Sequence, residues 1–182
     1  MSEQPEVWLR GPIAGIDPWL MPAAHALLQT YEDVDRAVAG LSTADLWRSV
    51  GGAAPLGFHL RHLSGSTDRL FTYARGERLN DAQRACLAAE KGSGDDTPDA
   101  ATLLAELRRT IDACIERLRV TPTASLQEVR TVGRAASSTA IGLLFHAAEH
   151  SQRHAGQVVT TAMILRGLGA SRSTDERRLG VQ

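Results

Sequence analysis

Three histidines recur at every fourth position in one stretch of the sequence, namely His146, His150 and His154. Residues of an α-helix are ~100° apart, so each four-residue step returns the imidazole to nearly the same face, about 5.4 Å farther along the axis. Neutral imidazole binds zinc, nickel, copper and iron, and two histidines with this spacing can share one ion. The row therefore predicts a metal site, although an isolated pair of this kind also occurs as solvated surface or as hydrogen-bonded core.

The helix that carries this row is expected to turn it toward packed protein. Its apolar residues fall near the histidine side and its polar residues form a separate strip. The apolar residues near the histidines are Leu143, Val158 and Leu165, with Thr161 beside them, and the polar strip is Glu149, Arg153 and Thr160. His146 and His154 lie ~12 Å apart along the axis and cannot share an ion. His146 is therefore expected to line a pocket or to belong to the core.

A third imidazole must come from elsewhere, and the remaining histidines are His25, His59 and His62. His59 and His62 belong to a second helical pattern, from Pro55 to about Gly76, with apolar residues at 3.6-residue spacing. His59 lies nearer the middle of the apolar stripe, so periodicity alone slightly favours it. The small pair Gly65–Ser66 extends the flank of His62, which permits close approach of a helix or leaves space for a ligand. His25 could face the same cavity or the surface.

The elements that position these histidines are predicted to be helices. The expected long helices cover about 18–39, 55–76, 97–119 and 138–166, with a short turn at 42–47 and a short helix near 81–91. Asp17-Pro18 is typical of a helix start, and Gly167 and Gly169 are expected to end the last helix. Residues 1–16 are expected to form an irregular arm, and residues 120–137 to pass extended over the surface. Four long amphipathic helices without a strand pattern predict an all-α four-helix bundle.

Composition fits one domain and argues against a nucleic-acid binder. The chain has 182 residues, of which 43% are hydrophobic and 23% charged, as in ordinary globular proteins. We expect a single bundle domain over 1–170 and a polar, mobile tail over 171–182. The net charge of −1 lacks the basic excess of a nucleic-acid binder, so no nucleic-acid partner is expected.

The sequence also predicts a cytoplasmic location and no membrane partner. Its first residues lack the basic and apolar regions of a signal peptide, and no apolar run approaches the ~20 residues that span a bilayer. Cys86 and Cys114 are isolated and lack metal-type spacing. They are expected to be reduced thiols rather than a disulfide or metal ligands.

Several polar residues near the histidines have expected supporting roles. Asp68 and Arg69, about two turns beyond His62, are predicted to form an ion pair. The run 137–139 is expected to cap the last helix. Gln157 is a candidate for holding an imidazole tautomer, as is Glu149, which however lies on the polar strip and is expected to be solvated.

The order of several short motifs resembles the DinB-like family of metal-binding proteins, which are DinB/YfiT-like four-helix bundles of unusual connectivity. The motifs are Trp8-Leu-Arg-Gly-Pro12, His25-Ala-Leu-Leu-Gln29, the stretch Gly57–Gly76 and Glu149-His-Ser-Gln-Arg-His-Ala-Gly-Gln157. The resemblance extends from about residue 8 to 169. It implies one divalent metal ion held by His62, which opens His-Leu-Ser-Gly-Ser, and by His150 and His154, the latter opening His-Ala-Gly-Gln. This assignment of His62 overrules the choice of His59 from periodicity.

The resemblance also implies a function. The resemblance implies enzymes that move low-molecular-weight thiols such as bacillithiol, mycothiol or glutathione onto electrophiles, or that isomerise substrates with thiol help, alongside many members without a known substrate. A zinc, nickel or iron ion with three neutral imidazole ligands can lower the pKa of a bound thiol or water. No carboxylate is clearly placed beside His150 or His154 as a general base, which favours thiol activation over the alternative of a metal-dependent hydrolase. The other alternative is a non-catalytic stress-response or binding module that the metal stabilises. A small-molecule substrate is expected.

The last helix has a second apolar surface on the side opposite the histidines. Its members are Ile141, Phe145, Ala148, Val159 and Ala162. A helix that is apolar on two faces must bury both, against neighbouring helices or against another subunit. Because twofold pairs are the commonest oligomers, a homodimer is expected.

Overall fold

The computed structural model describes residues 4–90, 97–134 and 136–179, with side chains as far as Leu168. In these ranges the long helices are α1 (Met21–Val38), α3 (Leu56–Ala74), α5 (Ala100–Val120) and α6 (Ala140–Leu179). α6 packs against α1 and α3, while α5 packs against the same two helices from the other side. The four helices therefore close around one core, which confirms the predicted all-α bundle.

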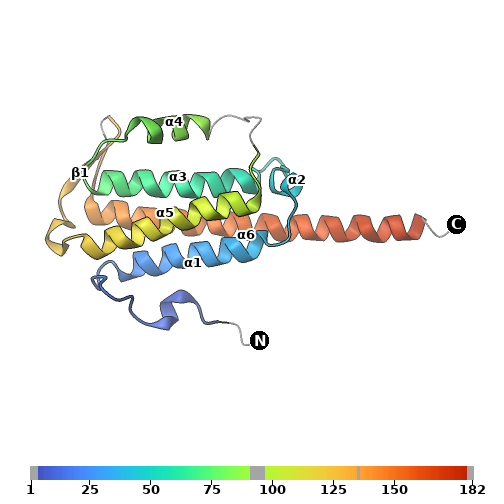
Figure 1. Cartoon of the computed structure of the whole chain (residues 1–182), viewed down its shortest axis with the longest axis horizontal. Helices are drawn as coiled ribbons and strands as arrows, with labels where there is room; N and C mark the ends of the chain where they lie inside the picture. Colours follow the sequence, from blue (N-terminus) through green and yellow to red (C-terminus); the bar gives the residue numbers. More distant parts are fainter. Residues whose placement is uncertain (1–3, 91–96, 135, 180–182) are drawn as a thin grey trace.

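The connectivity makes helices that are distant in sequence into neighbours (Figure 1). α1 and α6 lie side by side and run in the same direction, as do α3 and α5. α3 and α6 are antiparallel neighbours, because His59 contacts His154 whereas Thr67 contacts Ser151. This arrangement places the histidine row of α6 against the two histidines of α3.

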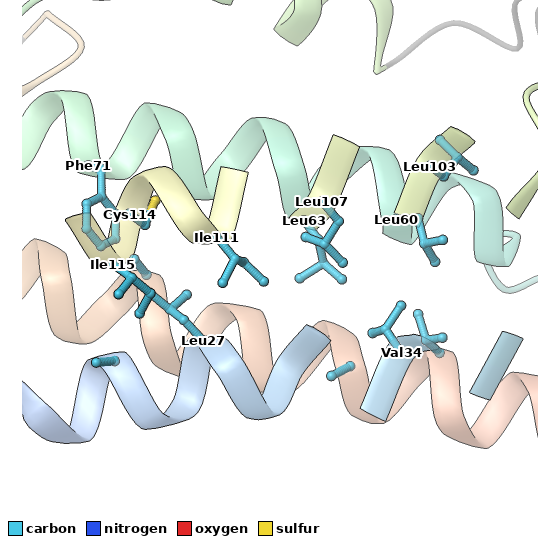
Figure 2. Packing of buried hydrophobic residues seen from close by; sticks show 14 of the residues in the cluster. Leu27, Val34, Leu60, Leu63, Phe71, Leu103, Leu107, Ile111, Cys114 and Ile115 are labelled. Carbon is cyan, nitrogen blue, oxygen red and sulfur yellow. The ribbon is translucent and has the colours of Figure 1, made fainter. Parts of the chain in front are cut away.

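Hydrophobic side chains from three of the helices converge on the bundle interior (Figure 2). The labelled members are Leu27 and Val34 of α1, Leu60, Leu63 and Phe71 of α3, and Leu103, Leu107, Ile111, Cys114 and Ile115 of α5, all of them buried. Burial of one such aliphatic side chain contributes roughly 1.5–3 kcal/mol. This core fixes the spacing of the helices, and hence the distance between the histidines of α3 and α6.

The beginnings of the helices follow local capping rules. Asp17 caps a turn before the first helix rather than the helix itself, since its side chain accepts from Trp19 N (2.9 Å) and α1 begins at Met21. The short helices α2 (Thr43–Leu46) and α4 (Asp81–Ala89) appear where the sequence predicts them. Ser42 caps α2, and Asn80 begins α4 with a reciprocal capping box.

The connection between α5 and α6 contains a short β-hairpin, which the sequence analysis did not anticipate. After the 3₁₀ turn η2 (Thr123–Ser125), strand β1 (Val129–Val132) pairs antiparallel with β2 (Ala136–Thr139). Each strand has only four residues, which is too short for an alternating pattern to stand out. Gly133 has φ +63°, a left-handed angle that glycine adopts without strain. Thr139 Oγ1 accepts from Gly142 N (3.1 Å), so the expected cap from 137–139 is present.

α6 is longer than predicted. It continues through Gly167 and Gly169 to Leu179 and extends well past the other helices (Figure 1). The expected stop was wrong because glycine ends a helix only where it takes a left-handed angle, and both glycines remain helical. The backbone of 171–179 is thus helical, whereas 180–182 lie outside the described residues. The mobility of this segment stays a prediction.

Two surface features complete the fold. The N-terminal arm contains the 3₁₀ turn η1 (Val7–Arg10), which contacts α1.

On the second apolar face of α6, Ala148 and Ala162 are buried within the chain while Phe145 is 67% exposed. Self-association through this face stays a prediction. Among the described residues, no helix combines the length and the apolar character needed to cross a membrane.

Candidate metal centre

The antiparallel packing of α3 on α6 brings His62, His150 and His154 together. Each offers a ring nitrogen, and these nitrogens all lie within 4.8 Å of one another. His62 Nε2 is 2.9 Å from His150 Nε2. The ring centroid of His154 lies 4.7 Å from that of His62 and 4.5 Å from that of His150. The residues that the sequence motifs single out therefore form one group that could hold a metal ion.

The group lies at the edge of the bundle core rather than inside it. On α6 the neighbouring Ala147, Ser151 and Ala155 are buried, whereas His150 and His154 are half-buried. Phe58 stacks on His62, with the two rings 5.6 Å apart and 7° from parallel. The imidazoles are thus packed on one side and partly exposed on the other.

The electrostatic environment keeps the α6 ligands uncharged. Burial, together with the proximity of His62, lowers the pKa of both His150 and His154 to about 4. Both rings are therefore neutral at neutral pH, and each retains a lone pair. Only the neutral imidazole can bind a metal, so the donor set fits a divalent transition metal.

His62 contacts an acidic side chain at the end of another helix, α4. Its Nδ1 lies 3.0 Å from Glu90 Oε2, at the end of α4. Arg69 holds the same carboxylate with two hydrogen bonds, Nη1 to Oε1 (2.7 Å) and Nη2 to Oε2 (3.1 Å). Burial raises the pKa of Glu90, but the hydrogen bonds from His62 and Arg69 outweigh it and leave the pKa below its usual value. The carboxylate is therefore charged and engaged through both oxygens.

His59 lies beside the group but not among its three members. It is 6% exposed, and its Nδ1 is 2.9 Å from Nδ1 of His154. Burial lowers its pKa, with a smaller contribution from His62. Periodicity thus correctly predicted that His59 faces inward. Periodicity did not, however, distinguish His62, whose Nε2 approaches His150, from His59, which contacts His154.

The two other histidines do not belong to this group. His146 is exposed, its Nδ1 contacts Glu149 Oε1 (2.7 Å) on the same helix, and its ring lies 5.4 Å from that of His150. It is therefore not part of the core, whereas its lining of a pocket stays a prediction. His25 contacts the carbonyl of Gly11 (3.0 Å) and borders a separate cavity under the N-terminal arm, beside Trp8. The alternative that His25 faces the histidine group is therefore wrong.

The supporting polar residues agree with the prediction only in part. Arg69 pairs with Glu90 rather than with Asp68, whose carboxylate instead accepts from Gln83 (2.5 Å). Adjacent residues on a helix point ~100° apart, so Asp68 and Arg69 reach different neighbours. Glu149 binds Arg153 and His146 on the surface, and Gln157 is exposed.

Glu90 is the residue that the sequence analysis missed. It lies 28 positions after His62, at the end of a helix in which no described residue is buried, so no periodic pattern marks it. The small pair 65–66 was the available signal. Gly65 faces Glu90 and Arg69 directly, so the close approach expected at this flank is made by a carboxylate from α4.

Neither cysteine of the chain is an activated thiol. Cys114 is buried on α5, where burial raises the pKa of its thiol to about 12. Cys86 is exposed on α4, and partial burial, followed by the charge of Glu90, raises its pKa as well. Both are free thiols, as predicted, and both are protonated at neutral pH.

Comparison with known proteins agrees with the geometry. The model of a protein family described as the DinB superfamily matches residues 26–158. This segment is most of the chain and contains His62, His150 and His154. No curated protein matches the chain.

Proposed function

The chain belongs to the DinB superfamily, and on that premise we propose that it is a metal-dependent enzyme that activates a low-molecular-weight thiol for transfer to an electrophile. The observation that carries the proposal is the group of three half-buried histidines, in which the α6 pair is neutral. His62, His150 and His154 would hold one zinc, nickel or iron ion. Such an ion keeps its full charge among neutral ligands and lowers the pKa of a coordinated thiol toward neutrality.

The carboxylates near the group favour thiol activation over hydrolysis. A hydrolase needs a general base that can accept a proton from the attacking water. Glu90 is the carboxylate in contact with the group, and Arg69 and His62 occupy both of its oxygens. Glu149 is bound to His146 and Arg153 on the outer surface of α6. Among the described residues, neither carboxylate is free to serve as that base.

The cysteines favour a thiol that comes from outside the chain. Cys114 is enclosed by the core, and its thiol has a pKa of about 12. Cys86 belongs to α4, and its pKa is raised too. A covalent mechanism that uses the chain's own cysteine would need a thiol of lowered pKa. The partly exposed histidine group is instead suited to a thiol from solution.

The experiment is a thiol-consumption assay on zinc-loaded protein purified without a metal-affinity column. Glutathione and cysteine are each combined with an epoxide, an aryl halide and an enone, and the loss of free thiol is followed against the uncatalysed rate. The metal-free protein and the His150→Ala/His154→Ala variant serve as controls. Turnover that requires both zinc and thiol is the expected result.

Two outcomes would contradict the proposal. Zinc-dependent cleavage of ester or amide substrates without thiol would identify a hydrolase. Stoichiometric zinc without catalysis of any thiol–electrophile pair would favour a module that uses the metal only for stability.

A further inference from the structure

We propose that Glu90 is a positioning residue, whose carboxylate holds His62 in the Nδ1-protonated tautomer and so directs the Nε2 lone pair into the three-histidine group. The inference rests on the proposed metal site, but not on the nature of the reaction. Glu90 does not itself act as a metal ligand in this account. Its effect on the metal is transmitted through the imidazole of His62.

The hydrogen bond between the two residues determines the tautomer. A carboxylate accepts but does not donate, so the nitrogen 3.0 Å from Glu90 Oε2 must carry the proton. In a neutral ring, the other nitrogen of His62 then has a lone pair. That nitrogen, Nε2, is the one that lies 2.9 Å from His150 Nε2.

A competing arrangement makes this control necessary. Without Glu90, the proton of His62 could move to Nε2 and donate to His150 across the same 2.9 Å contact. This hydrogen bond would occupy both nitrogens that face each other in the group. A metal would then have to displace it, and the affinity for metal would fall. Glu90 removes this competitor before any metal binds, since His62 can then only accept a hydrogen bond at Nε2.

Arg69 keeps the carboxylate in place and charged. Its guanidinium makes a two-bond fork to both oxygens of Glu90, the geometry in which an arginine most restricts a carboxylate. Both side chains are almost fully buried, 8% exposed for Arg69 and 6% for Glu90. The hydrogen bond to His62 is therefore made by a fixed acceptor rather than by a mobile surface side chain.

Gly65 provides the space through which Glu90 reaches α3. A Cβ atom at this position would overlap Glu90 Oε1 and lie 2.7 Å from Arg69 Nη1. Real Cβ atoms do not approach neighbours this closely, so any other residue at 65 would displace the carboxylate. The glycine of the His-Leu-Ser-Gly-Ser motif thus has a function in this chain: it admits the partner of the histidine three positions before it.

The first test compares Glu90→Gln with Glu77→Gln, which alters an exposed ion pair with Arg75. An amide cannot present two acceptor oxygens, so Glu90→Gln cannot satisfy the Arg69 fork and His62 together. Zinc affinity, measured by competition with a chromophoric chelator, should fall about 10- to 100-fold in Glu90→Gln and stay within about twofold in Glu77→Gln. Circular dichroism confirms that each variant is folded.

The second readout is the tautomer itself, which a purely structural role of the ion pair would not change. Long-range ¹H–¹⁵N spectra of the metal-free protein should show His62 protonated at Nδ1. The Glu90→Gln variant should shift toward Nε2 protonation. Unchanged zinc affinity together with an unchanged His62 tautomer would overturn the proposal.

A pair of glycine variants tests the same hydrogen bond without altering the carboxylate. Gly65→Ala should reproduce the loss of zinc affinity. Gly156→Ala on α6 is the matched control, because a Cβ there meets no described atom within 4 Å. Equal zinc affinity in the two variants would also overturn the proposal. If the unaltered protein binds no zinc, the metal site and this inference both fail. If it binds zinc and the affinity does not change in Glu90→Gln or Gly65→Ala, the inference alone fails.

Discussion

The molecule contains two clusters with the same residue types and the same order of contacts, but in different surroundings. In one, Glu90 joins His62 to Arg69, and in the other, Glu149 joins His146 to Arg153. The first cluster connects α3 to the end of α4, and its three side chains are 6–20% exposed. The second lies along the surface of α6, where the exposures are 35–57%.

The comparison indicates that burial, and not residue type, decides whether such a cluster can hold a side chain in place. Exposed ion pairs contribute about 0–1 kcal/mol, because water solvates each partner nearly as well. Removal of one partner from a buried pair leaves an uncompensated charge and costs roughly 3–5 kcal/mol. Only the buried cluster can therefore hold an imidazole in one orientation and one tautomer.

The largest expected contrast is in metal binding by the two cluster histidines. His62→Ala should lose stoichiometric zinc, because it removes a proposed ligand. His146→Ala should bind zinc like the unaltered protein, because His146 is exposed and contacts Glu149 instead. Isothermal titration with zinc measures both. Equal loss of binding in the two variants would show that the surface cluster belongs to the site.

The second contrast is in stability. Glu90→Ala should reduce the free energy of unfolding of the metal-free protein by about 3–5 kcal/mol, since it leaves Arg69 buried without a counter-charge. Glu149→Ala should cost less than about 1 kcal/mol. Urea denaturation followed by circular dichroism gives both values. Similar costs would mean that the difference in burial does not control the energetics.

A third contrast is a pH dependence that arises from the half-buried rings. The pKa of His150 and His154 is about 4 in the folded chain, against an ordinary value of 6.5. Between these values the unfolded state binds more protons, so the metal-free protein should lose stability as the pH falls from 6.5 toward 4. Above pH 6.5 these two residues should add no pH dependence.

Urea denaturation at pH 7.5, 6 and 5 in the presence of a chelator measures this slope. The His150→Gln/His154→Gln variant should show a shallower dependence than the unaltered protein. Identical slopes in the two proteins would contradict the lowered pKa values.

The sequence was sufficient for the parts of the site that lie on one regular helix. The four-residue spacing of His150 and His154 predicts that both point to one side, and α6 places them so. His62 required the motif resemblance, because α3 packs on both α5 and α6. Its buried surface is therefore too broad for the hydrophobic stripe to distinguish His59 from His62.

The parts that the sequence did not predict depend on contacts between elements. Glu90 follows a helix in which no described residue is buried, and only the folded chain places it at Gly65. The end of α6 was misjudged because a glycine is compatible with both a helix interior and a left-handed cap. The local sequence around Gly167 does not decide between these conformations.

The metal content of the protein tests the central claim most directly. The chain is purified without a metal-affinity column, incubated with excess zinc, desalted and analysed for metal, alongside the His150→Ala/His154→Ala variant. We predict about one zinc ion per subunit in the unaltered protein and none retained by the variant. Equal zinc in both proteins, or no zinc in either, would contradict a metal site formed by His62, His150 and His154.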